Sequence, residues 1–378
     1  MKITLKETPE QIQLIQAMAS RDPLVRMQAQ TSFAEYMGKP LAEAIMQAPT
    51  IGNFYTAMTY QKDSNPTIPL DLFSDVNDVG YFSVWSQHAD GGLGTNEVKP
   101  PSQEMFVDTY KLETAVSFLR KHAAQSRLGV VAKAMSRLGQ EILFLQDNFA
   151  AGPLMNSLAN ASTNGLSHVF RVGVADRFLP QDLANIRLRM KRVNTSWIKG
   201  TPVGSQGKIT DLLMSPEAAE ELRGMAYNAI NTKTAPQGSA VKDSVAAPES
   251  IREKLFESAG ISEFMGVSFH EYNEFGESRR FNTVFDVAAG STSYTMFDGS
   301  NGAVFSDSGD QLMVGIDRSK ECLLRLIATD SETGSTLDLQ ADNQFGVLNR
   351  AQDKIGYYGG LEEGRLVLDV RGLVGLIL

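Results

Sequence analysis

Cysteine is almost absent from this chain. One cysteine, Cys322, stands among 378 residues, so no internal disulfide bond can form. It opens the apolar run CLLRLIA, and buried free cysteines behave as small hydrophobic side chains. We therefore expect Cys322 to lie buried in a strand and to have no catalytic role.

Metal-ligand clusters and membrane segments are missing as well. The four histidines have no spacing typical of a zinc site: they are His88, His122, His168 and His270. A Gly/Ser-rich segment contains Asp298, Asp307 and Asp310. Their spacing is not that of an EF-hand, so we expect a solvated turn and not a calcium site. No apolar run approaches the ~20 residues that cross a bilayer, and the N-terminus MKITLKETPEQ lacks the apolar core of a signal peptide. We expect no metal, no membrane association and a cytoplasmic location.

Positive charge is in deficit. The chain has 44 acidic and 35 basic residues and a net charge of −9, which disfavours nucleic acid as its main ligand. One local exception is IRLRMKRV, whose alternation predicts a strand with Leu188 and Met190 on one side and a basic face on the other. That basic face consists of Arg187, Arg189 and Lys191. It could contact phosphate or form ion pairs with acidic groups of this or another subunit.

Catalytic motifs are also absent. GTPVGSQGKIT has Pro202 and Ile209 where a phosphate-binding loop requires glycine and a hydroxyl residue. GSTSY has Tyr294 where a nucleophile elbow requires its second glycine. We expect no enzymatic activity and no cofactor, and an α+β metabolic enzyme remains an alternative.

One segment, residues 104–149, is unusually long for a strand followed by a helix. From 106 to 118 the even-numbered positions are largely apolar, as in a half-buried strand. Such a strand would reach roughly 45 Å at ~3.4 Å per residue. A compact domain cannot bury it along its whole length, so part of it should project and contact another subunit.

A long amphipathic helix, residues 126–149, follows this strand. Ser126 is the expected N-cap. Apolar residues then recur every three or four positions: they are Leu128, Val131, Met135, Leu138, Ile142, Leu145 and Phe149. We expect this stripe to be buried along a helix of roughly 35 Å.

The N-terminal fifty residues are expected to form short amphipathic helices. Thr8-Pro9-Glu10-Gln11 resembles a capping box, a second helix would run from Pro23 to Gly38, and Pro40 would open a third. Their apolar side chains are too few for a separate core and must pack on this subunit or on a neighbour. These side chains are Ile12, Ile15, Leu24, Phe33 and Tyr36.

The remaining segments predict a hairpin and a strand-rich C-terminal part. Residues 77–87 alternate like a partner for the long strand, and the Gly/Pro-rich tip 88–103 completes a hairpin over 77–118. Residues 150–175 are loop-like. KITDLLMSPEAAEEL predicts a buried strand, a Ser215 cap and a helix, and the later apolar segments, including RRFNTVFDV, predict strands. Strands and helices do not alternate, so the class is α+β.

The order of these parts resembles the major capsid protein of tailed bacteriophages, the Hong Kong-phage-like fold. Local segments are also similar to that family. They are TDLLMSPEAAEELRGM, GISEFMGVSFHEYNEF, MVGIDRSK and DKIGYYGGLEEGRLVLDVRGLVGLIL. The resemblance covers nearly the whole chain and implies four parts. These would be an N-terminal helical arm (1–76), an extended-loop hairpin (77–118), a peripheral domain with a spine helix at 126–149 (119–172 and 321–366), and an axial domain (173–320 and 367–378).

The resemblance implies a structural function. The chain would self-assemble into hexamers and pentamers of an icosahedral shell around double-stranded DNA, in the virion, after assembly in the host cytoplasm. Its partners would be copies of itself, portal, scaffolding and decoration or cement proteins, and packaged DNA only through weak non-specific contact. Subunit contacts would come from the extended loop (Trp85, His88, Asp90, Lys99, Phe106, Tyr110) and from the N-terminal arm (Ile12, Ile15, Phe33, Tyr36). The shell of a bacterial encapsulin-type compartment, which shares the fold, remains an alternative.

Two features of some family members are not expected here. Where some carry a long, cleaved scaffolding domain, this chain has its helical N-terminal residues, so we expect no cleaved leader. Others crosslink a loop lysine to a neighbour's asparagine. Lys99 and either Asn343 or Asn349 match those positions, but no residue is specified as the catalytic acid, and we expect no crosslink.

Overall fold

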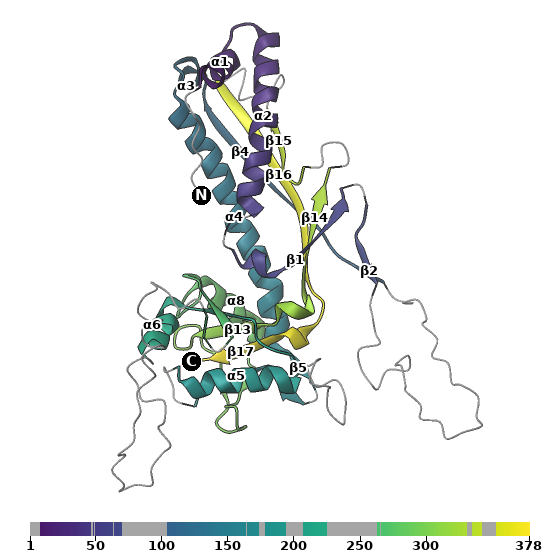
Figure 1. The fold of residues 1–378 in the computed structure, drawn as a ribbon, viewed down its shortest axis with the longest axis vertical. Coiled ribbons are helices and arrows are strands. Elements are labelled where there is room, and N and C mark those ends of the chain that lie inside the picture. Colours follow the sequence, from purple (N-terminus) through teal and green to yellow (C-terminus); the bar gives the residue numbers. More distant parts are fainter. Residues whose placement is uncertain are drawn as a thin grey trace, which may run out of the picture. The chain divides into compact units, whose positions relative to one another are not determined.

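The computed structural model confirms the α+β class. It describes residues 8–46, 48, 50–62, 64–69, 104–163, 165–173, 178–193, 207–224, 263–264, 266–330, 335–341 and 353–378. The chain divides into two compact units (Figure 1). Unit 1 comprises Met1–Ile68, Glu104–Ala150 and Leu324–Leu366, and unit 2 comprises Pro69–Gln103, Ala151–Leu323 and Val367–Leu378. The four-part division expected from the family remains a prediction.

A five-stranded sheet organises unit 1. Its order is β1 (Thr56–Gln61), β14 (Leu323–Thr329), β16 (Lys354–Val367) and β15 (Asp338–Ala341), with β4 (Tyr110–Leu119) also paired to β16. Strand β1 is parallel to β14, whereas β4 and β15 are antiparallel to β16. Strand β16 is 14 residues long, so it can pair with several partners along its length. It joins the predicted strand DKIGYYGG to the start of the predicted strand GRLVLDVRGLVGLIL in one continuous strand.

Helices cover this sheet and complete the core of unit 1. They are α1 (Pro9–Met18), α2 (Pro23–Met46), the short α3 (Arg120–Ala124) and the first part of α4 (Leu128–Ala159), with a 3-10 turn, η1, at Ile51–Phe54. Tyr357 of β16 lies at the centre of one cluster. Its ring packs against Phe33 and Phe118, and its hydroxyl lies 2.9 Å from the sulfur of Met18.

The N-terminal helices differ from the prediction in two ways. Residues 23–46 form one helix of 24 residues with Pro40 inside it, so the predicted break after Gly38 is wrong. Leu41 and Ile45 beyond the proline are buried, and that burial offsets the cost of about 3 kcal/mol for an internal proline. Thr8 makes no side-chain cap hydrogen bond, so the predicted capping box does not form, although Pro9 does begin α1.

Helix α4 is longer than predicted. It has 32 residues and continues through Pro153, because Ala150, Ala151 and Leu154 are buried. The assignment of 150–175 to a loop is therefore wrong for its first ten positions. Ser126 has a positive φ of 51° and lies before the helix, so it is not the N-cap. The predicted stripe is buried from Leu128 to Ile142, whereas Leu145 and Phe149 are partly exposed.

The long strand predicted for 106–118 is interrupted. Strand β3 (Glu104–Phe106) pairs with β2 (Thr67–Pro69), and β4 begins only at Tyr110. Within β4 the even-numbered residues point inward, as predicted. Phe106, in contrast, is 72% exposed, so the alternation reverses across residues 107–109. The gap lies against Gly364 of β16, where an added Cβ would come within 3.2 Å of the Asp108 carbonyl oxygen.

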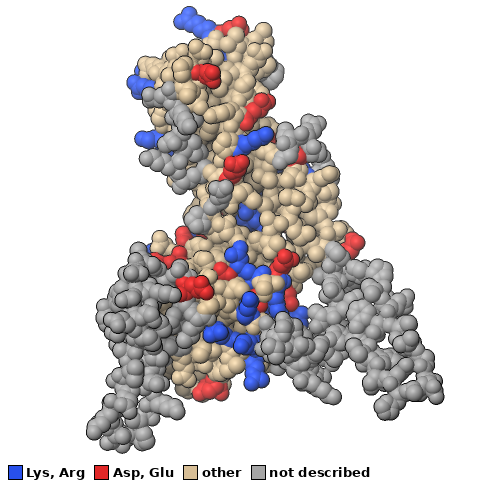
Figure 2. Space-filling view, in the orientation of Figure 1, with Lys and Arg blue, Asp and Glu red and all other residues tan. Residues whose placement is uncertain are grey.

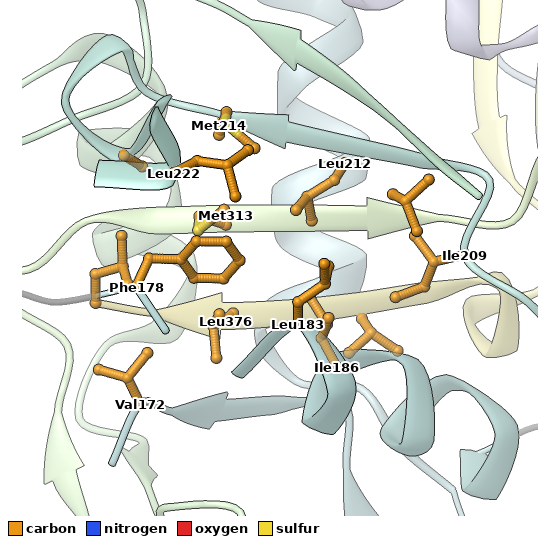
Figure 3. Close-up of a cluster of buried hydrophobic side chains, with 14 of the residues drawn as sticks. Val172, Phe178, Leu183, Ile186, Ile209, Leu212, Met214, Leu222, Met313 and Leu376 are labelled. Atoms are coloured by element: carbon orange, nitrogen blue, oxygen red, sulfur yellow. The ribbon is translucent and has the colours of Figure 1, made fainter. Parts of the chain in front are cut away.

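A six-stranded sheet forms the centre of unit 2. Its order is β7 (Val169–Arg171), β17 (Leu373–Ile377), β13 (Leu312–Ile316), β8 (Asp211–Met214), β10 (Val267–Glu271) and β9 (Glu263–Phe264). Strand β13 is antiparallel to both β17 and β8, whereas β10 is parallel to β8. Figure 3 shows side chains of β8, β13 and β17 meeting α5 (Pro180–Val193) in one apolar cluster.

Smaller elements surround the sheet of unit 2. They are helices α6 (Pro216–Gly224) and α8 (Arg280–Ala289), the 3-10 turns η3 (Arg318–Lys320) and η4 (Val370–Gly372), and the two-residue pairs β5 (Ser162–Thr163) with β6 (Leu166–Ser167) and β11 (Ser293–Tyr294) with β12 (Ala303–Val304). The predicted strand–cap–helix at 211–224 is confirmed, because Ser215 Oγ accepts a hydrogen bond of 3.1 Å from the Ala218 amide.

Two predicted strands of unit 2 are helices. IRLRMKRV belongs to α5, and all of RRFNTVFDV after its first residue belongs to α8. In α5 the buried residues follow a helical spacing: Leu183, Ile186, Met190 and Val193. The eight-residue window was too short to distinguish this period from alternation. Burial of the helical stripe against the sheet decides the structure.

Candidate assembly surfaces

Most of the predicted extended loop lies outside the described residues. This applies to the partner strand 77–87, the tip 88–103 and the contact residues Trp85, His88, Asp90 and Lys99. The described chain does define where this stretch begins and ends. Strands β2 and β3 pair with each other, and the Val107 amide donates to the Pro66 carbonyl oxygen at 3.3 Å. The two flanks of 70–103 are therefore joined side by side.

A buried ion cluster lies in unit 1, close to the paired strands β2 and β3. Glu363 is fully buried on β16 and contacts Arg325 at 2.9 Å and Arg365 at 3.1 Å. The Tyr110 hydroxyl and the Gln146 amide also donate to its carboxylate, at 2.7 and 3.3 Å. Burial raises the pKa of Tyr110 and lowers that of Arg325. The cluster thereby ties β4, β14, β16 and α4 together.

Sequence inspection missed this cluster, although a signal was present. Arg325, Glu363 and Arg365 are charged residues inside apolar strands, in LLRLIAT and EEGRLV. Charged residues are seldom fully buried unless they are paired. Glu363 and Arg365 are both on β16, but Arg325 comes from β14, so only the tertiary structure shows that all three charges meet.

Tyr110 and Phe106, both predicted as loop contacts, have different surroundings. Tyr110 stacks on Phe149 of α4 with ring centroids 4.4 Å apart, so both its ring and its hydroxyl are engaged within unit 1. Phe106 extends into solvent. Phe144 and Leu119 are also exposed apolar side chains of this unit. Contiguous exposed apolar patches are typical of surfaces that a protein partner covers, whereas single exposed side chains are common on any protein.

The N-terminal residues predicted to reach a neighbour divide into two classes. Ile15 and Phe33 are buried in the core of unit 1 with Phe118 and Tyr357. The structure therefore does not support a neighbour contact for these two. Ile12 is only partly buried, and Tyr36 is exposed beside a groove of about 870 Å³ between α2 and the sheet. Contacts through Ile12 and Tyr36 remain a prediction.

The predicted basic face is not one face. On helix α5, Arg189 turns inward, where its guanidinium lies about 5 Å from the rings of Phe170 and Phe297. Burial lowers the pKa of Arg189. Lys191 is exposed and Arg187 is half-buried. Residues two apart on a helix point in different directions, so the strand-based grouping of these three cations is wrong.

The polar groups that most resemble catalytic residues are held in structural roles. His270 Nε2 lies 2.8 Å from Asp211 Oδ1, and the Thr210 hydroxyl donates to the other carboxylate oxygen at 2.7 Å. Asp310 forms a two-bond ion pair with Arg171. Cys322 is buried, as predicted, and burial raises its pKa to about 12. Within the described ranges no three potential metal ligands come together.

No helix in the described part of the chain is long and apolar enough to span a membrane. The predicted crosslink partners Asn343 and Asn349 lie outside the described residues, as does Lys99.

Comparisons with known proteins identify similar solved structures. No family model matches the chain, and no curated protein matches its sequence. The capsid of the Cyanophage P-SCSP1u is 14% identical over 85% of this chain and 86% of that chain, with a TM-score of 0.48. The capsid of a native GTA particle is 10% identical, with coverages of 87% and 89% and a TM-score of 0.48. An encapsulin complex from Synechococcus elongatus is 14% identical, with coverages of 74% and 75% and a TM-score of 0.39.

Proposed function

We propose that this chain is a major capsid protein of a tailed bacteriophage, a structural subunit that forms hexamers and pentamers of an icosahedral shell around double-stranded DNA. The observation that carries the proposal is the construction of unit 1. Strands β2 and β3 join the flanks of residues 70–103, and next to them a buried ion cluster anchors β4 to α4 and β16. If residues 70–103 contact a neighbouring subunit, their two flanks must be held firmly in their own subunit. The β2–β3 pairing and the ion cluster provide that anchor.

Exposed apolar side chains of unit 1 support a covered surface. Phe106, Leu119 and Phe144 belong to β3, β4 and α4. Burying such side chains contributes a favourable free energy of about 25 cal/mol for each Å² of apolar surface that is removed from water. Contacts with a second copy would therefore stabilise the assembly through groups that the single subunit leaves in solvent.

The remaining parts of the proposal follow from the family resemblance. Residues 119–172 and 321–366 would form the peripheral domain, and 173–320 and 367–378 the axial domain. Portal, scaffolding and decoration proteins would be additional partners, DNA contacts would be weak, and assembly would occur in the host cytoplasm.

Electron microscopy of the purified full chain tests the proposed function. Closed particles or capsomer rings are expected. Small particles without a portal vertex that enclose a protein cargo would instead favour an encapsulin-type compartment. A monomer or small oligomer with a bound metabolite, and no rings under any condition, would contradict the shell function and favour an enzyme.

Deletion of residues 88–103 is expected to leave a folded subunit that fails to form stable shells. The pairing of β2 with β3 and the ion cluster lie outside the deleted stretch, so the fold of unit 1 should persist. Circular dichroism would measure folding, and sedimentation velocity would measure assembly. A Gly/Ser segment of equal length is the matched control, since it restores chain length without the native side chains. Wild-type sedimentation of the deletion variant would contradict the role of this stretch.

A further inference from the structure

The sheet of unit 2 has two distinct ends, set by its strand directions. Ile316, the last residue of β13, pairs with Asp211 at the start of β8 and with Leu373 at the start of β17. At the opposite end, Glu271 of β10 pairs with Met214 of β8. In Figure 3, Ile209 and Met214 mark these two ends of β8. We call them the 211 end and the 214 end.

Cations gather at the 211 end. They are Lys191 and Arg192 in the last turn of α5, Lys208, Arg318, Lys320 and Arg371. Local bonds hold their segments together: the Lys208 amide donates to Asp317 Oδ2, and the Arg318 amide donates to Thr210 Oγ1, each at 3.0 Å. Figure 2 shows lysines and arginines collected over this region of unit 2. Among the described residues, the surface carboxylates at this end are fewer, namely Glu263, Glu321 and Asp369, and the last is bound to Arg371.

Helix α5 runs from one end of the sheet to the other. Before its start, the Phe178 amide donates to Glu221 of α6 at 2.6 Å, at the 214 end. Further along, the Ile186 side chain lies beside Gly315 and Ile209, at the 211 end. The basic last turn of α5 therefore belongs to the 211 end.

Carboxylates gather at the 214 end. They are Glu217 and Glu220 of α6, Glu271 at the end of β10, and Glu274 and Glu277 in the turn that follows. The turn and α6 are close, because an added Cβ at Gly276 would lie 3.1 Å from Glu217 Oε2. The Tyr272 amide also donates to the Met214 carbonyl oxygen at 3.0 Å. Among the described residues, the cations at this end are Arg279, Arg280 and Arg171, and the last is bound to Asp310.

The two ends are far enough apart to act separately. Strand β13 has five residues, which at about 3.4 Å per residue separates the ends by roughly 15 Å. This exceeds the Debye length of about 8 Å at physiological ionic strength. Each end therefore presents its own sign of charge to an approaching molecule.

We propose that the 211 end of one copy binds the 214 end of unit 2 in the next copy. The inference rests on the proposed function and names the contact between axial parts. Complementary patches on one unit define a heterologous, head-to-tail contact, and such contacts generate rings when the rotation closes. Charge complementarity of this kind also fixes orientation and excludes wrong partners.

A second copy fits these observations better than a nucleic acid. A polyanion would use only the 211 end, would leave the 214 end uncovered, and would approach a chain of net charge −9. A second copy uses both ends at once. Binding of the full chain to double-stranded DNA that is lost with the 211-end cations, without any change in self-association, would favour the nucleic acid instead.

Charge reversal at each end tests the pairing. Arg192→Glu/Lys208→Glu makes the 211 end acidic, and Glu271→Lys/Glu277→Lys makes the 214 end basic. Each full-length variant alone should associate about tenfold or more weakly than wild type, because like charges then meet. A 1:1 mixture of the two variants, or a chain carrying all four substitutions, should recover association. Lys133→Glu/Arg137→Glu on the exposed face of α4 is the matched control.

Sedimentation velocity measures the self-association of each variant, because it detects head-to-tail pairs, rings and shells. Circular dichroism confirms that each variant is folded. Undiminished association of both single-end variants would overturn the inference, and so would a loss that neither the mixture nor the fourfold variant restores. The proposed function fails separately, if wild-type protein forms no rings or shells in the electron microscope. The sedimentation comparison still decides the charge pairing in that case.

Discussion

Replacing Leu138 by aspartate is expected to unfold unit 1. Leu138 is 2% exposed on α4, and an added Cβ at Gly359 of β16 would lie only 2.9 Å from its Cδ2. Loss of a buried leucine alone costs about 3–5 kcal/mol, and a buried carboxylate without a partner adds several more. The sum is comparable with a total stability of about 5–15 kcal/mol. Circular dichroism and urea denaturation would measure the loss.

Leu145→Asp is the matched control for this change. Leu145 lies on the same helix but is 37% exposed, so the new carboxylate can remain hydrated. We expect a change of at most about 0.5 kcal/mol, typical of a surface substitution. Equal urea midpoints for the two variants would show that α4 does not bury Leu138 against β16.

Replacing Glu363 by glutamine is expected to have the second largest effect. Its carboxylate is the shared partner of Arg325 and Arg365, and all three side chains are buried. Removing the negative charge leaves two buried guanidinium groups uncompensated, and breaking a buried ion pair in this way costs about 3–5 kcal/mol. Chemical denaturation would measure this loss. We also expect increased hydrogen exchange in β4, because Tyr110 loses its anionic acceptor.

Two further variants separate the charge effect from general damage. Glu113→Gln removes a surface carboxylate that pairs with Lys111 of the same strand, and exposed pairs contribute about 0–1 kcal/mol. Arg325→Met should cost less stability in the Glu363→Gln background than in wild type, since it then removes an uncompensated charge. Additive costs in this double-mutant cycle would contradict the described cluster.

Local signals in the sequence predicted several elements well. Strand β8, its Ser215 cap and helix α6 follow from a short apolar run and a serine before proline. The first half of α4 and the alternation within β4 were also predicted from periodicity. In each case residues close in sequence carry the pattern, although β4 and β8 form their strand hydrogen bonds with distant segments.

Elements whose stability comes from distant residues were predicted poorly. Helix α2 continues through Pro40 because Leu41 and Ile45 pack with Leu138 and Ile142 of α4. Helix α4 continues through Pro153 because the residues around it are buried. A proline in the sequence indicates a break, and only the packing of a distant element shows that the break is outweighed.

The sequence by itself determined the α+β class, the scarcity of cysteine chemistry and the buried stripe in the first part of the central helix. Tertiary structure decided which charges are buried and which are displayed. Glu363 meets Arg325, and the 211 and 214 ends acquire opposite signs, only through the register and direction of strands that are distant in the chain. Periodicity reports the face on which a side chain lies. Its electrostatic partners depend on long-range pairing, because charges interact through space and not along the chain.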